Sequence, residues 1–174
     1  MEVCCGSATS TFCRGVFVKI CFELNGKQVT LEIEQRETLA EVLRGRCRLT
    51  GVKISCEAQV CGSCTVLVNG LPVSACTLLG YEVRGKRVTT IEGLAREAGR
   101  LHPIQQAFLD NFSFQCGFCT PGMILTAKAL LDENSAATDE EIIAHMSGNL
   151  CRCTGYLPIL KAIRQAAAVL RGQK

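Results

Sequence analysis

The sequence has 174 residues, of which 48% are apolar and 20% are charged, and its formal net charge at pH 7 is only +3. This length allows one ordinary domain or two small ones. Acidic and basic residues are mixed along the chain, so the clustered basic face of a nucleic-acid-binding protein is not expected. The densest basic stretch, residues 44–53, follows a predicted short helix, where cations suit the negative end of the helix dipole. A solvated helix end is therefore favoured there over a partner-docking patch.

Residues 16–34 alternate between apolar and polar side chains, which predicts a half-buried β-hairpin with its turn at Asn25-Gly26. Residues 37–46 then predict a short helix. Its apolar face is formed by Leu39, Val42 and Leu43. A cysteine-rich loop follows this helix.

A second hairpin is predicted from strands at residues 65–68 and 72–75, joined across Asn69-Gly70. Residues 87–91 predict a last strand. Strands with one helix packed across them indicate an α+β sheet domain. We place this domain at residues 16–92, after an N-terminal extension of residues 1–15.

After Glu92 the spacing of apolar residues becomes helical, and short connections between helices predict a compact four-helix domain at residues 93–174. The predicted helices are residues 103–112, 121–132, 139–147 and 158–170. Thr120 before Pro121 predicts an N-cap hydroxyl followed by proline at the first helical position. Thr138 and Glu141 form a capping-box pattern, and Gly148 predicts the end of that helix.

This second part contains a loose internal repeat, in which a helix, a pair of cysteines and another helix follow one another twice. The first copy carries Cys116 and Cys119, and the second carries Cys151 and Cys153. Two such hairpins that face each other would bring four thiols to one point.

Thirteen cysteines are the outlying feature of the composition. They could form a secreted disulfide framework, structural zinc sites or iron–sulfur clusters. The start of the chain has no secretory-signal pattern, and no apolar run has the length of a membrane span. We therefore expect a cytoplasmic protein. In that reducing compartment grouped thiols bind metal more often than they pair, which disfavours the disulfide framework.

The first thiol set is Cys56, Cys61, Cys64 and Cys76. Its C-x4-C-x2-C run with a distant fourth cysteine is the plant-type ferredoxin spacing for a [2Fe–2S] cluster. Gly62, between two expected ligands, would let the backbone approach the cluster with a positive φ, so that amides could donate to sulfur. Structural zinc prefers paired C-x2-C knuckles, which the four-residue gap does not match.

The second thiol set is Cys116, Cys119, Cys151 and Cys153. Alone, its paired short spacings fit tetrahedral zinc, a redox dithiol or an iron–sulfur cluster. A ferredoxin loop on the same chain favours the iron–sulfur interpretation.

The remaining cysteines and the histidines have simpler interpretations. Cys21 in a strand and Cys47 beyond a helix are expected to be small core residues. Cys4, Cys5 and Cys13 lie in the extension without a recognisable ligand spacing. His102 and His145 are expected at helix ends rather than as ligands.

Three motifs together carry a family resemblance. CEAQVCGSC at residues 56–64, QCGFCTPG at residues 115–122 and GNLCRCTGY at residues 148–156 resemble the small iron–sulfur subunit of the molybdenum hydroxylases. This family includes xanthine dehydrogenase, aldehyde oxidoreductase and aerobic carbon monoxide dehydrogenase. The resemblance covers residues 16–170 and implies an N-terminal β-grasp ferredoxin domain and a C-terminal four-helix domain.

The resemblance also implies an electron relay in a hetero-oligomer, a heterotrimer in the simplest case. Electrons would leave a molybdenum–molybdopterin cofactor in a large subunit, pass through the helical-domain cluster and the ferredoxin-domain cluster, and reach FAD in a medium subunit. By the same resemblance Gln115 would contact the pterin, and Cys153 would be the cluster ligand nearest to it. The alternative for Gln115 is a helix-end hydrogen bond that orients the Cys116 loop.

Two positions depart from the family pattern, which commonly has glycine just before the first ligand and three residues after it. Ser55 and Gln59 occupy these positions here. A positive φ at Gln59 would carry some strain, so we expect the cluster to bind with an altered potential or solvent exposure.

The chain has no dinucleotide-binding or P-loop motif and no His/Asp/Ser set at catalytic spacing. We therefore predict an electron-transfer subunit of an oxidoreductase, with a large apolar docking surface on its helical half. A stand-alone ferredoxin-like carrier would explain only the first thiol set. A zinc-stabilised interaction module would explain only the second.

Overall fold

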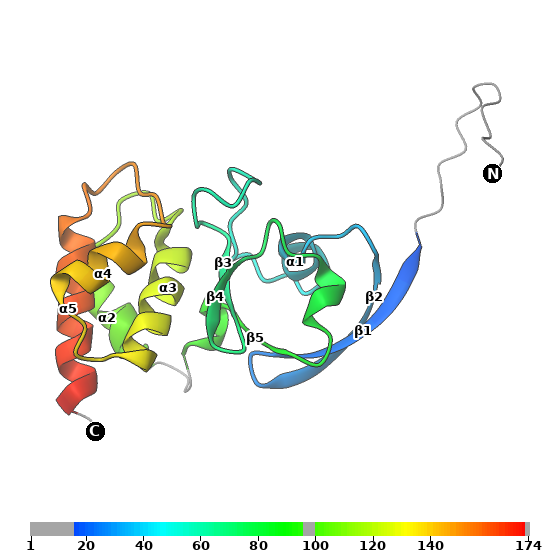
Figure 1. Ribbon diagram of the computed structural model, residues 1–174, viewed down its shortest axis with the longest axis horizontal. Coiled ribbons are helices and arrows are strands. Elements are labelled where there is room, and N and C mark those ends of the chain that lie inside the picture. Colours follow the sequence, from blue (N-terminus) through cyan, green and yellow to red (C-terminus); the bar gives the residue numbers. More distant parts are fainter. Residues whose placement is uncertain (1–15, 96–99, 173–174) are drawn as a thin grey trace.

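The computed structural model describes residues 16–95 and 100–172, which form a strand-containing half and a helical half lying side by side (Figure 1). In chain order the elements are β1 (Phe17–Leu24), β2 (Lys27–Glu34), α1 (Leu39–Glu41) continued by a π-helical turn (Val42–Arg46), β3 (Thr65–Val68), β4 (Leu71–Ser74), β5 (Arg87–Thr89), α2 (Pro103–Asp110), α3 (Thr120–Glu133), α4 (Asp139–Met146) and α5 (Leu157–Gly172). The predicted α+β architecture is confirmed. The extension with Cys4, Cys5 and Cys13 lies outside the described residues.

The strands form one five-stranded sheet in the order β2-β1-β5-β3-β4. Only the β1–β5 pair is parallel, and the other neighbours are antiparallel. Both predicted hairpin turns are present, with left-handed φ values of 52° at Asn25 and at Asn69 and of 81° and 88° at the glycines that follow. β4 begins one residue earlier than predicted, and β5 ends at Thr89 because residues 91–93 turn into a short 3-10 helix.

One face of the sheet is covered by the short helix α1 and its π-helical continuation. Leu39, Val42 and Leu43 are fully buried as predicted, and they belong to the same core as Ile20 and Phe22 of β1. Thr38 caps this helix through a capping box with Glu41. A helix packed across a mixed sheet in this way is the β-grasp arrangement.

The basic stretch at residues 44–53 stabilises the start of the cysteine-rich loop through hydrogen bonds. Arg44 donates hydrogen bonds to the carbonyl oxygens of Thr50 and Val52, the latter at 2.6 Å, and Arg46 pairs with Glu37 at 2.8 Å. These bonds support the helix-end interpretation.

The prediction for Cys21 is wrong, because its side chain is exposed. Ile20 and Phe22, its neighbours in β1, are buried, and alternation along a strand turns Cys21 to the opposite face. Cys47 is half-buried and packs against the sheet core, as expected.

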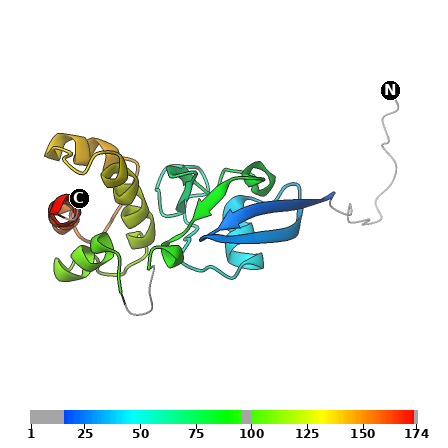
Figure 2. The same ribbon diagram turned by 90° about the horizontal axis from the view of Figure 1, so that it is seen from below.

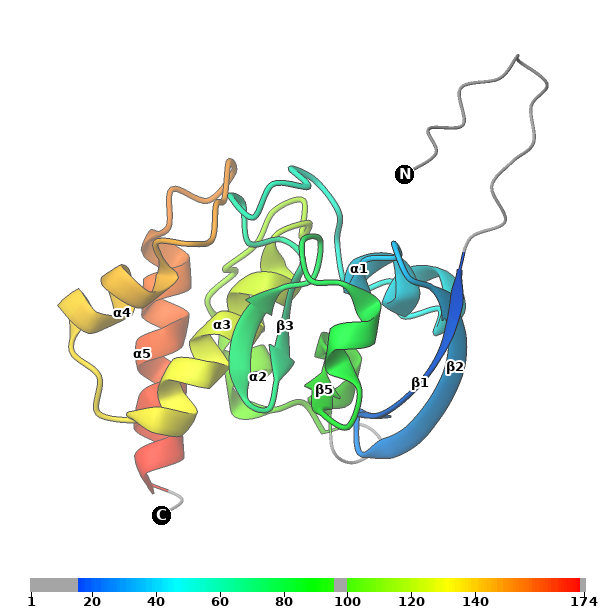
Figure 3. The same ribbon diagram turned by 45° about the vertical axis from the view of Figure 1, so that its right-hand side comes forward.

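The four predicted helices are all present, with ends that differ from the prediction by at most two residues. α2 packs beside α5 and α3 beside α4, and their apolar faces form a second core centred on Ile104, Phe108, Met123 and Ile163. α3 also packs against β3, so it joins the two halves. Figures 2 and 3 show α3 facing the sheet and α5 on the side away from it. None of the helices within the described ranges is long and apolar enough to cross a membrane.

The helix ends confirm one capping prediction and correct another. Thr138 and Glu141 form the predicted box, and His102 caps α2 by accepting a hydrogen bond from the amide of Ile104. Thr120 is not an N-cap: α3 begins with it, Cys119 holds the cap position, and the Thr120 hydroxyl is buried without a hydrogen-bond partner. Gly148 does follow the C-cap of α4, but its φ is not left-handed.

Two phenylalanines of the helical half allow a matched test of this core. Phe108 is 1% exposed and Phe112 is 82% exposed. Phe108→Ala should lower the free energy of unfolding by about 3–5 kcal/mol, because it leaves a cavity among α2, α3 and α5. Phe112→Ala should change it by no more than about 0.5 kcal/mol. Denaturant unfolding of the full chain measures both, and equal losses would contradict this packing.

Candidate functional site: two thiol sets at the seam between the halves

The first thiol set is held by the loop before β3 and by the turn after β4. Cys56 and Cys61 are half-buried on the loop, Cys64 is buried directly before β3, and Cys76 is buried two residues after the end of β4. Because β3 and β4 pair from Thr65–Ser74 onward, the ends of one hairpin fix Cys64 and Cys76 close to each other. The structure thus brings together the distant fourth cysteine and the loop, as the spacing predicts.

The loop folds back on the sulfur of Cys56. The amides of Ala58, Val60 and Cys61 donate to this sulfur at 3.5, 3.4 and 3.4 Å. These amide hydrogen bonds lower the pKa of the Cys56 thiol to about 6, so they favour the thiolate that iron requires.

Left-handed backbone at two non-glycine residues makes this fold-back possible. φ is 52° at Glu57 and 57° at Gln59, so the condition under which Gln59 would carry strain is met. The Gln59 side chain also accepts a hydrogen bond, at 3.2 Å, from the hydroxyl of Thr77, the residue after Cys76. The Gln59 side chain therefore links the Cys56 loop to the residue that follows the fourth cysteine.

Gly62 has the expected positive φ, 67°, but the amides that donate to sulfur come from the preceding residues. Burial raises the pKa of the Cys64 thiol to about 11. Metal binding at this thiol would therefore displace a tightly held proton.

The second thiol set is formed by the two helix–helix junctions that the internal repeat predicted. Cys116 and Cys119 precede α3, Cys151 and Cys153 precede α5, and the sulfurs of Cys116 and Cys153 lie 3.7 Å apart. Left-handed φ values at Gly117 and Gly155, 77° and 65°, turn the chain at each junction.

Inner and outer thiols of this set differ in exposure. Burial raises the pKa of the Cys119 thiol to about 12. At Cys151 burial is outweighed by hydrogen bonds from Thr154, whose hydroxyl lies 3.2 Å from the sulfur, and the pKa is lowered. Cys116 and Cys153 are exposed at the surface.

Both sets border on one cavity of about 420 Å³. Its lining includes all four thiols of the second set and Cys61 of the first. Around them stand Phe118, Leu150 and Tyr156. Over the described parts of the chain, no three His, Cys, Asp or Glu side chains gather as ligands of a single metal ion.

Gln115 lies at the exposed rim, where its side-chain amide donates to the carbonyl oxygen of Cys153 at 3.1 Å. This bond links the Cys116 loop to the junction that carries Cys153. It can therefore orient the Cys116 loop, as the alternative interpretation of Gln115 expected, although it is not a helix-end hydrogen bond. Sequence reasoning also missed Tyr156, whose hydroxyl accepts a hydrogen bond from the amide of Cys151 at 3.0 Å. Its place in the GNLCRCTGY motif was the available signal.

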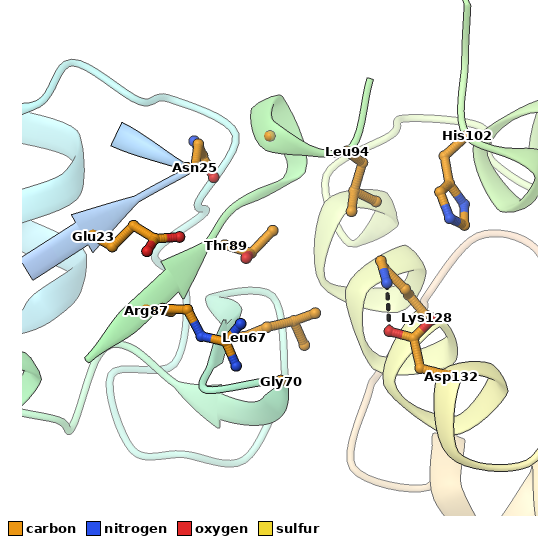
Figure 4. A pocket seen from close by; sticks show the side chains of 12 residues that line it. Glu23, Asn25, Leu67, Gly70, Arg87, Thr89, Leu94, His102, Lys128 and Asp132 are labelled. Atoms are coloured by element: carbon orange, nitrogen blue, oxygen red, sulfur yellow. Dashed lines mark hydrogen bonds and ion pairs between the residues drawn. The ribbon is translucent and has the colours of Figure 1, made fainter. Parts of the chain in front are cut away.

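A separate cavity of about 480 Å³ lies at the other end of α3 from these thiols (Figure 4). Its charged lining balances Glu23 and Asp132 against Arg87 and Lys128, and Lys128 pairs with Asp132. None of the described residues that line it is a cysteine, and it is separate from the two thiol sets.

Two domain families match the chain, and both bind iron–sulfur clusters. The family described as "2Fe-2S iron-sulfur cluster binding domain" matches residues 22–95, and the one described as "[2Fe-2S] binding domain" matches residues 90–164. The donor sets agree with these matches, because each half supplies four thiols. The second match favours iron–sulfur over zinc for the helical half.

Similar proteins share nearly the whole fold. The nicotinate dehydrogenase small FeS subunit of Eubacterium barkeri is 48% identical over 86% of this chain and 94% of its own. The nicotine 6-hydroxylase small subunit of Paenarthrobacter nicotinovorans is 45% identical over 86% and 89%. Quinoline 2-oxidoreductase from Pseudomonas putida 86 superposes with a TM-score of 0.86, at 42% identity over 90% of this chain and 97% of the other.

The expected resemblance is therefore confirmed, with a β-grasp ferredoxin domain followed by a four-helix [2Fe–2S]-binding domain. The chain belongs to the family of small iron–sulfur subunits of the molybdenum hydroxylases.

Proposed function

We propose that this electron-transfer subunit relays electrons from a molybdenum–molybdopterin cofactor in a large partner subunit to FAD in a medium partner subunit. When bound, its two [2Fe–2S] clusters supply one-electron chemistry. The observation that carries the proposal is the shared cavity, in which Cys61 of the first thiol set borders the four thiols of the second.

The proposed ligands of the first cluster are Cys56, Cys61, Cys64 and Cys76, on the ferredoxin domain of residues 16–92. The proposed ligands of the second are Cys116, Cys119, Cys151 and Cys153, on the helical domain of residues 93–174. The geometry supports this assignment through the three amides aimed at Cys56 and the hydroxyl beside Cys151. Such donors stabilise negative charge on sulfur and tune the potential of a cluster.

The large subunit would dock at the exposed end of the second thiol set. Cys116, Cys153 and Gln115 reach the surface there. Exposed apolar side chains are numerous in the same loops and at the start of α5: Phe112, Phe118, Leu150 and Leu157. The bond to Cys153 uses one amide hydrogen of Gln115, and its side-chain oxygen is the group we assign to the pterin contact.

The medium, FAD-binding subunit would dock at the opposite end of the relay. The Cys56 loop projects residues 57–60 into solvent, with Val60 61% exposed. An exposed apolar residue on the loop that surrounds a proposed ligand suits a partner that must approach the cluster closely. A heterotrimer in the cytoplasm is the simplest assembly with these two contacts, and the grouped free thiols suit that reducing compartment.

A stand-alone ferredoxin-like carrier is the second candidate. Its supporting observation is that the first thiol set is complete within the sheet half. It leaves the exposed Cys116–Cys153 rim and its apolar surroundings without a role.

The ligand assignment predicts selective cluster loss. Cys153→Ser in the full chain should lower iron and acid-labile sulfide to about half while the first cluster remains, because only one thiol set loses a ligand. Cys21→Ser is the control, since it changes an exposed thiol outside both sets. Metal and sulfide analysis with visible absorption measures both variants. Full iron content in Cys153→Ser would count against the assignment.

If the large subunit docks on this surface, a substitution there should weaken binding without lowering the stability of the chain. Phe112→Ala should leave the chain folded but weaken its binding to the large subunit by about tenfold or more, because buried aromatic anchors dominate interface energies. Phe17→Ala makes the same change at a residue 52% exposed on the sheet half and should leave this binding unchanged. Co-purification and titration of tagged subunits compare the two. Equal binding by both variants would place the surface elsewhere.

The Gln59 contact predicts a change in potential. Gln59→Gly should retain the first cluster but raise its midpoint potential, because loss of the side chain admits water that stabilises the more negative reduced form. Thr77→Val removes the same hydrogen bond and should shift the potential in the same direction. EPR-monitored redox titration measures the shift. Unchanged potential and stability in Gln59→Gly would show that this residue does not shield the cluster.

A further inference from the structure

The carbonyl oxygen of Gly62 is the point at which the two thiol-bearing loops meet. Within the sheet half it accepts hydrogen bonds from the amide and the hydroxyl of Thr65, at 3.2 and 2.8 Å. From the helical half it accepts a third, at 3.0 Å, from the side-chain amide of Asn149. Asn149 is 4% exposed, so this contact is shielded from water.

A second hydrogen bond runs beside the first. The amide of Leu150 donates to the carbonyl oxygen of Cys61 at 2.9 Å. Cys61 belongs to the first thiol set, and Leu150 directly precedes Cys151 of the second. The two bonds therefore join the main chains next to one thiol from each set.

Neither Gly62 nor Gly122 could carry a side chain at this contact, because the two loops approach too closely there. A Cβ on Gly62 would lie 2.4 Å from the side-chain amide nitrogen of Asn149 and 2.5 Å from the backbone carbonyl oxygen of Gly148. A Cβ on Gly122, in α3, would lie 2.2 Å from the carbonyl oxygen of Gly62. The closeness of the halves therefore requires glycine at both positions, and the positive φ of Gly62 is a second reason for glycine there.

The end of α4 helps to position Asn149. Its backbone amide donates to the carbonyl oxygen of Met146 at 3.0 Å, just beyond the end of α4. A buried amide side chain that lost its acceptor would carry a desolvation cost, so this arrangement opposes any widening of the seam.

We infer that Asn149 is a positioning residue that fixes the spacing between the two thiol sets. It acts through its hydrogen bond to the Gly62 carbonyl. Together with the Leu150–Cys61 hydrogen bond, this contact keeps Cys61 and Cys151 at a constant separation. The inference rests on the proposed relay, in which electron transfer between the two sites slows steeply with distance.

Asn149→Asp in the full chain tests this role, since it keeps the size of the side chain but replaces the donating amide by an oxygen that repels the Gly62 carbonyl. Hydrogen exchange measured by mass spectrometry should become about tenfold faster in residues 57–64 and 147–155 together, the factor expected for loss of one buried hydrogen bond. In the dithionite-reduced chain, the magnetic interaction between the two clusters in the EPR spectrum should weaken. Asn111→Asp is the matched control, because its amide donates to the carbonyl oxygen of Ala107 within the helical half alone, at 2.8 Å.

Gly122→Ala provides a second variant if Asn149→Asp does not fold. Alanine favours a helix more than glycine does, so any loosening must come from the methyl group wedged against Gly62. Coupled loosening of both segments with a weaker magnetic interaction supports the inference. Wild-type exchange in either segment, or an unchanged magnetic interaction, overturns it. Failure of the relay itself would instead appear in the wild-type chain as a missing cluster, and the exchange comparison would still decide the role of Asn149.

Discussion

Eight thiols from distant parts of the chain must gather in two sets, with Cys61 of one set bordering the other, and the rest of the structure depends on meeting this geometric constraint. A sulfur ligand carries negative charge, so each loop must also present donors to it and exclude much of the water. The loop around Cys56 does this with three amides, which it can aim only because Glu57 and Gln59 have left-handed backbone. In the helical half the hydroxyl of Thr154 lies 3.2 Å from the sulfur of Cys151, and left-handed backbone at Gly117 and Gly155 turns the chain at the two junctions. The two cores then hold these loops against each other.

The division into two halves follows from this constraint. A β-hairpin brings Cys64 and Cys76 together at the ends of paired strands, whereas two helix junctions bring Cys116 and Cys153 within 3.7 Å of each other. α3 packs on both the sheet and α4, so it is the common support of the two sites. Cys116 and Cys153 of the second set are exposed, and so are residues 57–60 of the loop that holds the first set, so each set can be reached from solvent.

Local signals in the sequence predicted most of the fold, because they act over a few residues. Asn-Gly pairs fixed both hairpin turns, and the Thr138–Glu141 pair marked the start of α4. The N-cap prediction for Thr120 was wrong because α3 begins at Thr120 and Cys119 holds the cap position. The Thr-Pro pair alone does not distinguish these two placements. Cys21 was misplaced although the alternation of β1 pointed it outward. The contact between Asn149 and Gly62 spans 87 positions, and no local pattern predicts it.

We propose that this one chain carries two distinct [2Fe–2S] clusters close enough to form a relay. The most direct measurement is quantitative EPR of the dithionite-reduced full chain, with metal analysis of the same sample. We expect two distinct signals that together account for two spins per chain, no stoichiometric zinc, and line broadening from the interaction between the clusters. A single signal with one spin per chain, accompanied by zinc, would contradict the account, because the helical thiol set would then be structural.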